Sequence, residues 1–195
     1  RDMHAAAMAA AAEADLFIAV AAVADYRPES VAEQKIKKTD GVARITLARP
    51  EHNVLDIEMM TELNAELDFL GVDPELKCAV ILGAGPSWCA GVEVADHKPE
   101  MVSEMIAVFN GIFERIDKIE VPVIAGVHGA CLGGGMEVAI ACDVIVAAKS
   151  ASFGQPEIKL GFFPPYAAIR LPQLIGPARA VEVCTTGRRY SAEEA

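Results

Sequence analysis

The sequence predicts an α/β fold, and three observations lead to this prediction. Short apolar runs with the pattern of strands alternate along the chain with runs whose apolar residues recur at helical spacing. The turns between them span a few residues and contain glycine or proline. Hydrophobic residues make up 53% of the 195 residues and charged residues 23%, a composition that can bury the core of roughly one domain.

The first segment, residues 1–38, combines one predicted helix with one predicted strand. Residues 2–14 are rich in alanine, the strongest helix former, and residues 16–20 form an apolar run typical of a buried parallel strand. A basic cluster at 35–38 closes the segment. We expect it to be separate from a larger domain formed by residues 39–195.

The larger segment opens with a strand and a helix. Residues 42–47 alternate between apolar and polar side chains, as in a half-buried strand, and the run ends before Pro50. Apolar residues then recur at helical spacing over 57–69, and Asp56 precedes them as a candidate N-cap.

Further strands and helices alternate along the rest of the chain. Strands are expected at 78–82, 121–127 and 144–147, and helices at 102–116 and 137–142. Such alternation is typical of an α/β architecture.

Charge and cysteine content exclude several classes of function. The net charge of −11 and the pI near 4.8 oppose binding to nucleic acid or to an anionic membrane surface. No apolar run reaches the roughly 20 residues that a membrane helix needs. The five cysteines include no CxxC pair, which favours reduced thiols in the cytoplasm and predicts no metal site.

Two glycine turns are candidates for a functional site. Residues 126–135 run from a predicted strand through three consecutive glycines toward a predicted helix. Glycines let the backbone approach a ligand, and N–H groups at the start of a helix can stabilise a developing oxyanion. A second glycine turn, at 88–93, could bring another N–H to the same end of the sheet. A phosphate loop and a tight turn without a ligand are the alternatives, although neither GxxxxGK[ST] nor GxGxxG is present.

Two carboxylates accompany these turns. Glu137 falls in the first turn of the helix after the glycines, and Glu157 ends the Phe-Gly-Gln-Pro-Glu stretch at 153–157. Oxyanion donors beside two carboxylates suit proton transfer or water addition next to a thioester carbonyl. The structural alternatives are that Glu137 complements the helix dipole and that Glu157 is a solvated turn residue.

From about residue 40 onward, the order and spacing of these motifs resemble the crotonase superfamily of enoyl-CoA hydratases and isomerases. The similarity lies in Arg-Pro-Glu-His-Asn at 49–53, Cys-Ala-Gly at 89–91, Gly-Ala-Cys-Leu-Gly-Gly-Gly-Met-Glu at 129–137, Cys-Asp at 142–143 and Phe-Gly-Gln-Pro-Glu at 153–157. The resemblance implies a crotonase-like ββα superhelix core. It also implies C-terminal truncation, before helices that complete the acyl pocket and the trimer contacts in relatives.

The resemblance further implies roles for individual residues. The backbone N–H groups of Val92 and Gly134 would form the oxyanion hole for a coenzyme A thioester, while Glu137 activates water and Glu157 delivers a proton. Because many isomerases of the superfamily lack one of the two glutamates, the pair favours a hydratase. Coenzyme A would enter as part of the acyl-CoA substrate with no further cofactor, and the protein would be a homo-oligomer, a trimer or a dimer of trimers.

The stretch after Glu157 departs from ordinary hydratases, which have a glycine-rich stretch there. Gly-Phe-Phe-Pro-Pro-Tyr at 161–166, together with residues 92–97, resembles the cyclohexa-1,5-diene-1-carbonyl-CoA hydratases of anaerobic benzoyl-CoA degradation. Its aromatic side chains would wall an acyl pocket for a flat cyclic group, or else serve as core or subunit-contact residues: Phe162, Phe163 and Tyr166. His97 is expected on the surface rather than as a base.

Residues 1–38 resemble part of a different family, the phosphopantothenate–cysteine ligases of coenzyme A biosynthesis. Ala21, Ala22 and Lys35 match positions that serve the nucleotide-activated substrate of that Rossmann-like domain. The nucleotide-binding start of such a domain is not found, so ligase activity is not expected.

The leading functional hypothesis is a hydratase that acts on a 2-enoyl-CoA, and a cyclic dienoyl-CoA is one candidate substrate. An enoyl-CoA isomerase and a non-catalytic acyl-CoA-binding or assembly module are the alternatives, and a ligase fragment is a remote one. The hydratase hypothesis requires both glutamates.

Overall fold

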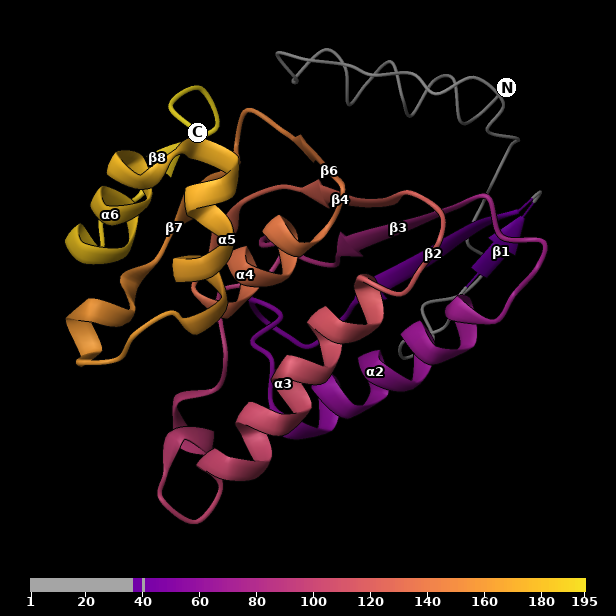
Figure 1. Cartoon of the computed structure of the whole chain (residues 1–195), viewed down its shortest axis with the longest axis horizontal. Coiled ribbons are helices and arrows are strands. Elements are labelled where there is room, and N and C mark those ends of the chain that lie inside the picture. The colour runs from indigo at the N-terminus through magenta and orange to yellow at the C-terminus, as the bar shows by residue number, and fades with distance from the viewer. Residues whose placement is uncertain (1–36, 40) are drawn as a thin grey trace.

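A five-stranded, mostly parallel sheet forms the body of the molecule in the computed structural model, which describes residues 37–39 and 41–195 (Figure 1). The first strand pairs antiparallel with the second, and the remaining neighbours are parallel. In sheet order the strands are β1 (Lys37–Thr39), β2 (Val42–Leu47), β3 (Cys78–Gly83), β4 (Val123–Val127) and β6 (Val144–Ala147). The α/β fold class predicted from the alternating pattern is confirmed.

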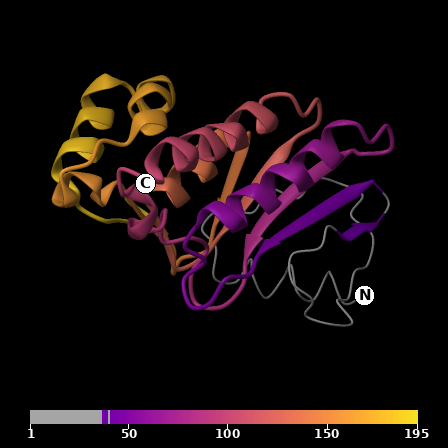
Figure 2. The same ribbon diagram turned by 90° about the horizontal axis from the view of Figure 1, so that it is seen from below.

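Two long helices, α2 (Ile57–Gly71) and α3 (Val102–Ile116), lie side by side across one face of this sheet (Figure 2). Their apolar stripes face inward because the side chains recur at helical spacing. Asn64 of α2 joins the two helices by donating to the Val108 carbonyl oxygen at 2.8 Å. The core between helices and sheet includes Met60, Leu63, Leu67, Ile81 and Ile112, all essentially inaccessible to solvent.

A second, three-stranded sheet directly follows β4 and leads into the C-terminal helices. It comprises β5 (Ala130–Leu132), β7 (Ser152–Gly154) and β8 (Tyr190–Ser191). The elements around it are α4 (Gly134–Ala141), α5 (Pro165–Ile175), α6 (Pro177–Thr186) and the short 3₁₀ helices η1 (Val94–His97) and η2 (Pro156–Leu160). Nearly every residue of α4 is buried, as expected of a helix without a polar face.

Most predicted elements are present, with shifted ends where glycine or proline intervenes. The strands at 42–47 and 144–147 and the helix at 102–116 are confirmed at both ends. The strand expected from residue 121 begins only at Val123, because Pro122 has no N–H for a neighbouring strand. The helix expected from Glu137 begins earlier, at Gly134.

The N-terminal part of the prediction falls largely outside the described residues. This applies to the helix and strand expected at 2–20 and to the ligase-like residues Ala21, Ala22 and Lys35. The last residues of the expected first domain, Lys37 and Lys38, pair with β2 and so extend the sheet of the larger domain. Within the described part of the chain, no helix has the length and apolar character needed to cross a membrane.

Asn53 connects the loop after β2 to the turn after β3. Its side chain is buried, and its amide nitrogen donates to the carbonyl oxygens of Ala84 and Ser87 at 2.8 Å and of Trp88 at 3.1 Å. The side-chain oxygen accepts from the backbone N–H of Arg49 at 2.9 Å. With a φ of +52°, Asn53 adopts a left-handed backbone conformation that asparagine tolerates better than most residues.

Replacing Asn53 with alanine should lower the free energy of unfolding by about 2–4 kcal/mol, because two buried carbonyl oxygens and a part-buried one lose their donor. Denaturant unfolding of the variant measures the loss. Asn110→Ala, at an exposed position of α3, is the matched control and should change stability by no more than about 0.5 kcal/mol. Equal effects of the two substitutions would contradict this role of Asn53.

Candidate active site

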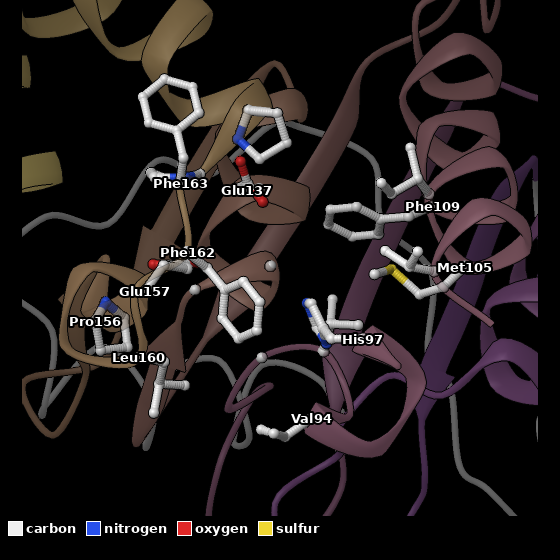
Figure 3. A pocket seen from close by; sticks show the side chains of 18 of the residues that line it. Val94, His97, Met105, Phe109, Glu137, Pro156, Glu157, Leu160, Phe162 and Phe163 are labelled. Atoms are coloured by element: carbon white, nitrogen blue, oxygen red, sulfur yellow. The ribbon is translucent and has the colours of Figure 1, made fainter. Parts of the chain in front are cut away.

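A cavity of about 270 Å³ lies between η1 and α3 on one side and α4, η2 and the segment after η2 on the other (Figure 3). Most of its walls are apolar. Both predicted catalytic glutamates, both predicted oxyanion-hole residues and two of the three predicted aromatic residues line it: Glu137, Glu157, Val92, Gly134, Phe162 and Phe163. The structure thus brings together residues that are far apart in the sequence.

The two glycine turns meet at the base of this cavity. A Cβ atom built on Gly134 would lie 2.5 Å from Cγ2 of Val92, which is a steric clash. Glycine has no Cβ atom and therefore fits at this position. Backbone hydrogen bonds hold the turns together, since Cys89 N–H donates to the Ala130 carbonyl and Leu132 N–H donates to the Cys89 carbonyl, both at 3.0 Å. The close approach places the backbone at Val92 beside the start of α4.

The N–H groups of Val92 and Gly134 remain available to a ligand. A bridge to Leu55 uses the groups on either side of Val92: Leu55 N–H donates to the Gly91 carbonyl and Glu93 N–H donates to the Leu55 carbonyl, both at 2.8 Å. Gly134 begins α4, where the first N–H groups have no partner within the helix. Among the described residues, neither the Val92 nor the Gly134 N–H donates a hydrogen bond.

Glu137 is a buried carboxyl group on the first turn of α4. Its Oε1 accepts from the Ala167 backbone N–H at 2.8 Å, and only 2% of the residue is exposed. Burial raises the pKa of Glu137 from 4.5 to about 7, the negative charge of Glu157 adds to the rise, and backbone N–H groups of Ala167 and Tyr166 oppose it. This carboxyl group can therefore exchange a proton near neutral pH.

Glu157, in η2, faces the same cavity. One neighbour, Gln155, binds its carboxylate, and another, Gly133, leaves space for it. Burial raises the pKa of Glu157. The side-chain amide of Gln155 is fully buried, and its hydrogen-bonding groups find suitable partners when its nitrogen faces Glu157. In this orientation the nitrogen donates to both carboxylate oxygens of Glu157 at 3.0 Å. Gly133 leaves room for this carboxylate: a Cβ atom at this position, where φ is +54°, would lie 2.8 Å from Oε1 of Glu157.

The aromatic residues after η2 have different environments. Phe162 lines the cavity and packs against His97, with 4.6 Å between the ring centroids, whereas Phe163 lines it but leaves 69% of its surface exposed. The expectation that Tyr166 walls the same cavity is corrected. Its ring stacks on Phe113 at 3.9 Å between centroids and lines a separate hollow between α3 and α5.

Two residues of the site were not assigned a function from the sequence. His97, expected on the surface, is half-buried and lines the cavity, because η1 folds back toward α3. Gln155 belongs to the Phe-Gly-Gln-Pro-Glu motif at 153–157, but the sequence assigns it no role of its own. Its position two residues before Glu157 is the one signal that could have identified it, since Gln155 occupies the N-cap position of the short helix η2 that carries Glu157.

No cluster of metal-ligating side chains occurs among residues 37–39 and 41–195. The charged groups of the cavity are instead the two carboxyl groups, which face apolar walls and backbone donors. This arrangement is suited to acid–base chemistry on a substrate whose developing negative charge the backbone stabilises.

Two families match the chain. The family described as enoyl-CoA hydratase/isomerase matches residues 37–195, and the family described as DNA/pantothenate metabolism flavoprotein C-terminal domain matches residues 1–64. The matches overlap at 37–64, a range whose described residues lie mainly in the sheet and in α2.

Individual relatives match most of this chain but only part of their own length. Cyclohexa-1,5-dienecarbonyl-CoA hydratase of Thauera aromatica is 33% identical over 82% of this chain and 62% of the relative. Mevalonyl-coenzyme A hydratase of Beauveria bassiana is 38% identical over 77% of this chain and 58% of the relative. Among solved structures, an enoyl-CoA hydratase from Bacillus anthracis has a TM-score of 0.79 at 34% identity, covering 83% of this chain and 66% of that protein.

Replacing Glu137 with glutamine should stabilise the protein at high pH only. In the folded protein its pKa of about 7 exceeds the ordinary 4.5, so its contribution to stability falls as the pH rises from 4.5 to 7. Glu137→Gln should raise the free energy of unfolding by about 3 kcal/mol near pH 8 and by close to zero near pH 4.

Denaturant unfolding at both pH values measures this difference, with Glu104→Gln on the exposed surface of α3 as the matched control. The control should show little change at either pH. A gain in Glu137→Gln that does not depend on pH would contradict the raised pKa.

Proposed function

Because the chain belongs to the enoyl-CoA hydratase/isomerase family, we propose that it adds water to the double bond of a 2-enoyl-CoA thioester. One observation carries this proposal: two carboxyl groups line the same cavity as Val92 and Gly134, whose backbone N–H groups have no hydrogen-bond partner in the part of the chain that the structure describes. An isomerase needs to move only a proton, whereas hydration needs one group to activate water and another to protonate carbon.

The proposed reaction begins with the thioester carbonyl oxygen bound by the N–H groups of Val92 and Gly134. These donors draw electron density toward the oxygen and make the β-carbon electrophilic. Glu137 takes a proton from a water molecule while the oxygen of that water bonds to the β-carbon. Glu157 donates a proton to the α-carbon. The double bond is replaced by one C–O and one C–H bond, and a proton transfer from Glu137 to Glu157 restores the starting state.

The pKa of Glu137 supports its role as the base. A base is most effective when its pKa lies near the working pH, and this one is raised to about 7. Gln155 supports the role of Glu157, because its amide holds the carboxyl group in one orientation. The negative charge of Glu157 contributes to the raised pKa of Glu137, after burial.

The acyl group is proposed to be cyclic and dienoic. Phe162 and Phe163 line the cavity and offer flat, apolar surfaces suited to a six-membered ring. The similarity to the Thauera aromatica relative, whose name specifies a cyclohexa-1,5-dienecarbonyl-CoA, also supports this choice. Participation in benzoyl-CoA degradation is part of the same proposal.

The remaining features of the proposal concern the organisation of the protein. We propose a cytoplasmic homo-oligomer, supported by free cysteine thiols and by exposed apolar side chains such as Ile169 on α5 and Val181 on α6. Residues 1–38 are proposed to be a ligase-like domain fragment, and residues 39–195 the acyl-CoA domain. The match of residues 1–64 to a second family supports a ligase-like origin of the N-terminal part, and this match overlaps the acyl-CoA domain at 37–64.

Glu137→Gln and Glu157→Gln should each lower kcat for hydration by about 10²–10⁴-fold, because each amide can no longer exchange a proton. Loss of the conjugated thioester absorbance measures the rate with a cyclic dienoyl-CoA and with a straight-chain enoyl-CoA. Glu104→Gln is the matched control and should retain the wild-type rate.

Folded wild-type protein that binds acyl-CoA without converting either thioester would contradict the proposed hydratase. That result would favour a non-catalytic acyl-CoA-binding module. Isomerisation of the double bond without addition of water would favour the isomerase instead.

A further inference from the structure

His97 is a polar group in an otherwise apolar part of the cavity. Among the described residues that line the cavity, it is the one titratable side chain besides Glu137 and Glu157. It extends from η1 toward the space between Phe162 and Phe109, whereas Glu157 projects from the wall formed by η2 (Figure 3). The proposed hydration does not use it.

A hydrogen bond determines which ring nitrogen of His97 is available. Nδ1 lies 3.0 Å from the backbone carbonyl oxygen of Glu93. Because a carbonyl oxygen can only accept a hydrogen bond, Nδ1 carries the hydrogen, and in the neutral ring Nε2 is left with a lone pair. Nε2 has no hydrogen-bond partner within residues 37–39 and 41–195.

The ring of His97 is held in place from two sides. Its Nδ1 is bound to the residue that directly follows Val92, so its position is linked to the proposed oxyanion hole. Its face packs against Phe162 with an angle of 38° between the rings. The acceptor atom is therefore fixed relative to the point where the thioester carbonyl would bind.

The neighbours of His97 make it costly to leave Nε2 without a hydrogen bond when a substrate is bound. Around it the cavity is lined by apolar side chains: Val94, Val102, Met105, Ile106, Phe109 and Phe162. An acyl group that fills this space removes water from Nε2. A purely hydrocarbon group would leave the nitrogen without a partner, whereas a hydroxyl group would donate to it.

We propose that His97 is a specificity-determining residue whose Nε2 accepts a hydrogen bond from a hydroxyl group carried by the acyl portion of the substrate. This inference rests on the proposed function and deepens it. The substrate class is then a cyclic dienoyl-CoA that carries a hydroxyl group on its ring, and this hydroxyl group is distinct from the one formed by hydration. The proposed hydroxyl group would contact the wall of the cavity that η1 and α3 form.

Binding of saturated thioesters, which cannot be hydrated, tests this proposal without turnover. The probes are cyclohexanecarbonyl-CoA derivatives with a hydroxyl group at ring carbon 3 or 4, each compared with the derivative that has a methyl group there. Calorimetry on the full chain should show that at least one hydroxyl probe binds roughly 10-fold or more tightly than its methyl counterpart.

His97→Leu should abolish this preference, and His97→Gln should retain part of it, because a glutamine amide can present a polar atom near the position of Nε2. Cooperative thermal unfolding of both variants establishes that they fold. If every methyl probe binds as tightly as its hydroxyl partner, or if His97→Leu keeps the preference, the role of His97 is wrong while the hydratase proposal is unaffected. If folded wild-type protein binds no thioester, both proposals are wrong.

Discussion

The close approach of two glycine turns is the constraint on which the rest of the site depends. Gly134 and Val92 come so near each other that a Cβ atom at residue 134 would lie 2.5 Å from the valine side chain. This contact sets the start of α4 beside the turn after β3, and Glu137 then follows on the first turn of that helix. The parallel sheet makes the contact possible, because β3 and β4 are parallel neighbours and the segments that follow them pair again at Cys89 and Cys131.

Burial of the Glu137 carboxyl group in a cavity that Glu157 also lines has an energetic cost that the surrounding fold must offset. Desolvation and the charge of Glu157 raise the pKa of Glu137, while the backbone N–H groups of Ala167 and Tyr166 lower it. The Gln155 amide donates instead to the carboxylate of Glu157. A well-packed core under α2 and α3, together with the buried hydrogen bonds of Asn53, holds the turns in place. Proteins commonly concentrate such costs at their functional sites.

Local sequence patterns predict much of this architecture, whereas contacts between distant segments determine the rest. The α/β alternation, Asp56 as the N-cap of α2 and the glycine turns were all predictable, since each depends on periodicity or on a short motif. Tyr166 and His97 were not, because the sequence does not show which way a side chain points. The start of α5 directs the Tyr166 ring onto Phe113, and η1 turns His97 into the cavity. The likeness to solved enoyl-CoA hydratases establishes the fold, whereas residue roles rest on geometry and chemistry.

A carbon-13 NMR titration of the Glu137 carboxyl group tests the central claim most directly, with the resonance identified by its loss in Glu137→Gln. The account predicts a midpoint near pH 7, and a lower midpoint in Glu157→Gln, where the neighbouring negative charge is absent. A midpoint near the ordinary value of 4.5 that Glu157→Gln leaves unchanged would contradict it. In that case Glu137 would be ionised at neutral pH and its proton affinity would not depend on Glu157.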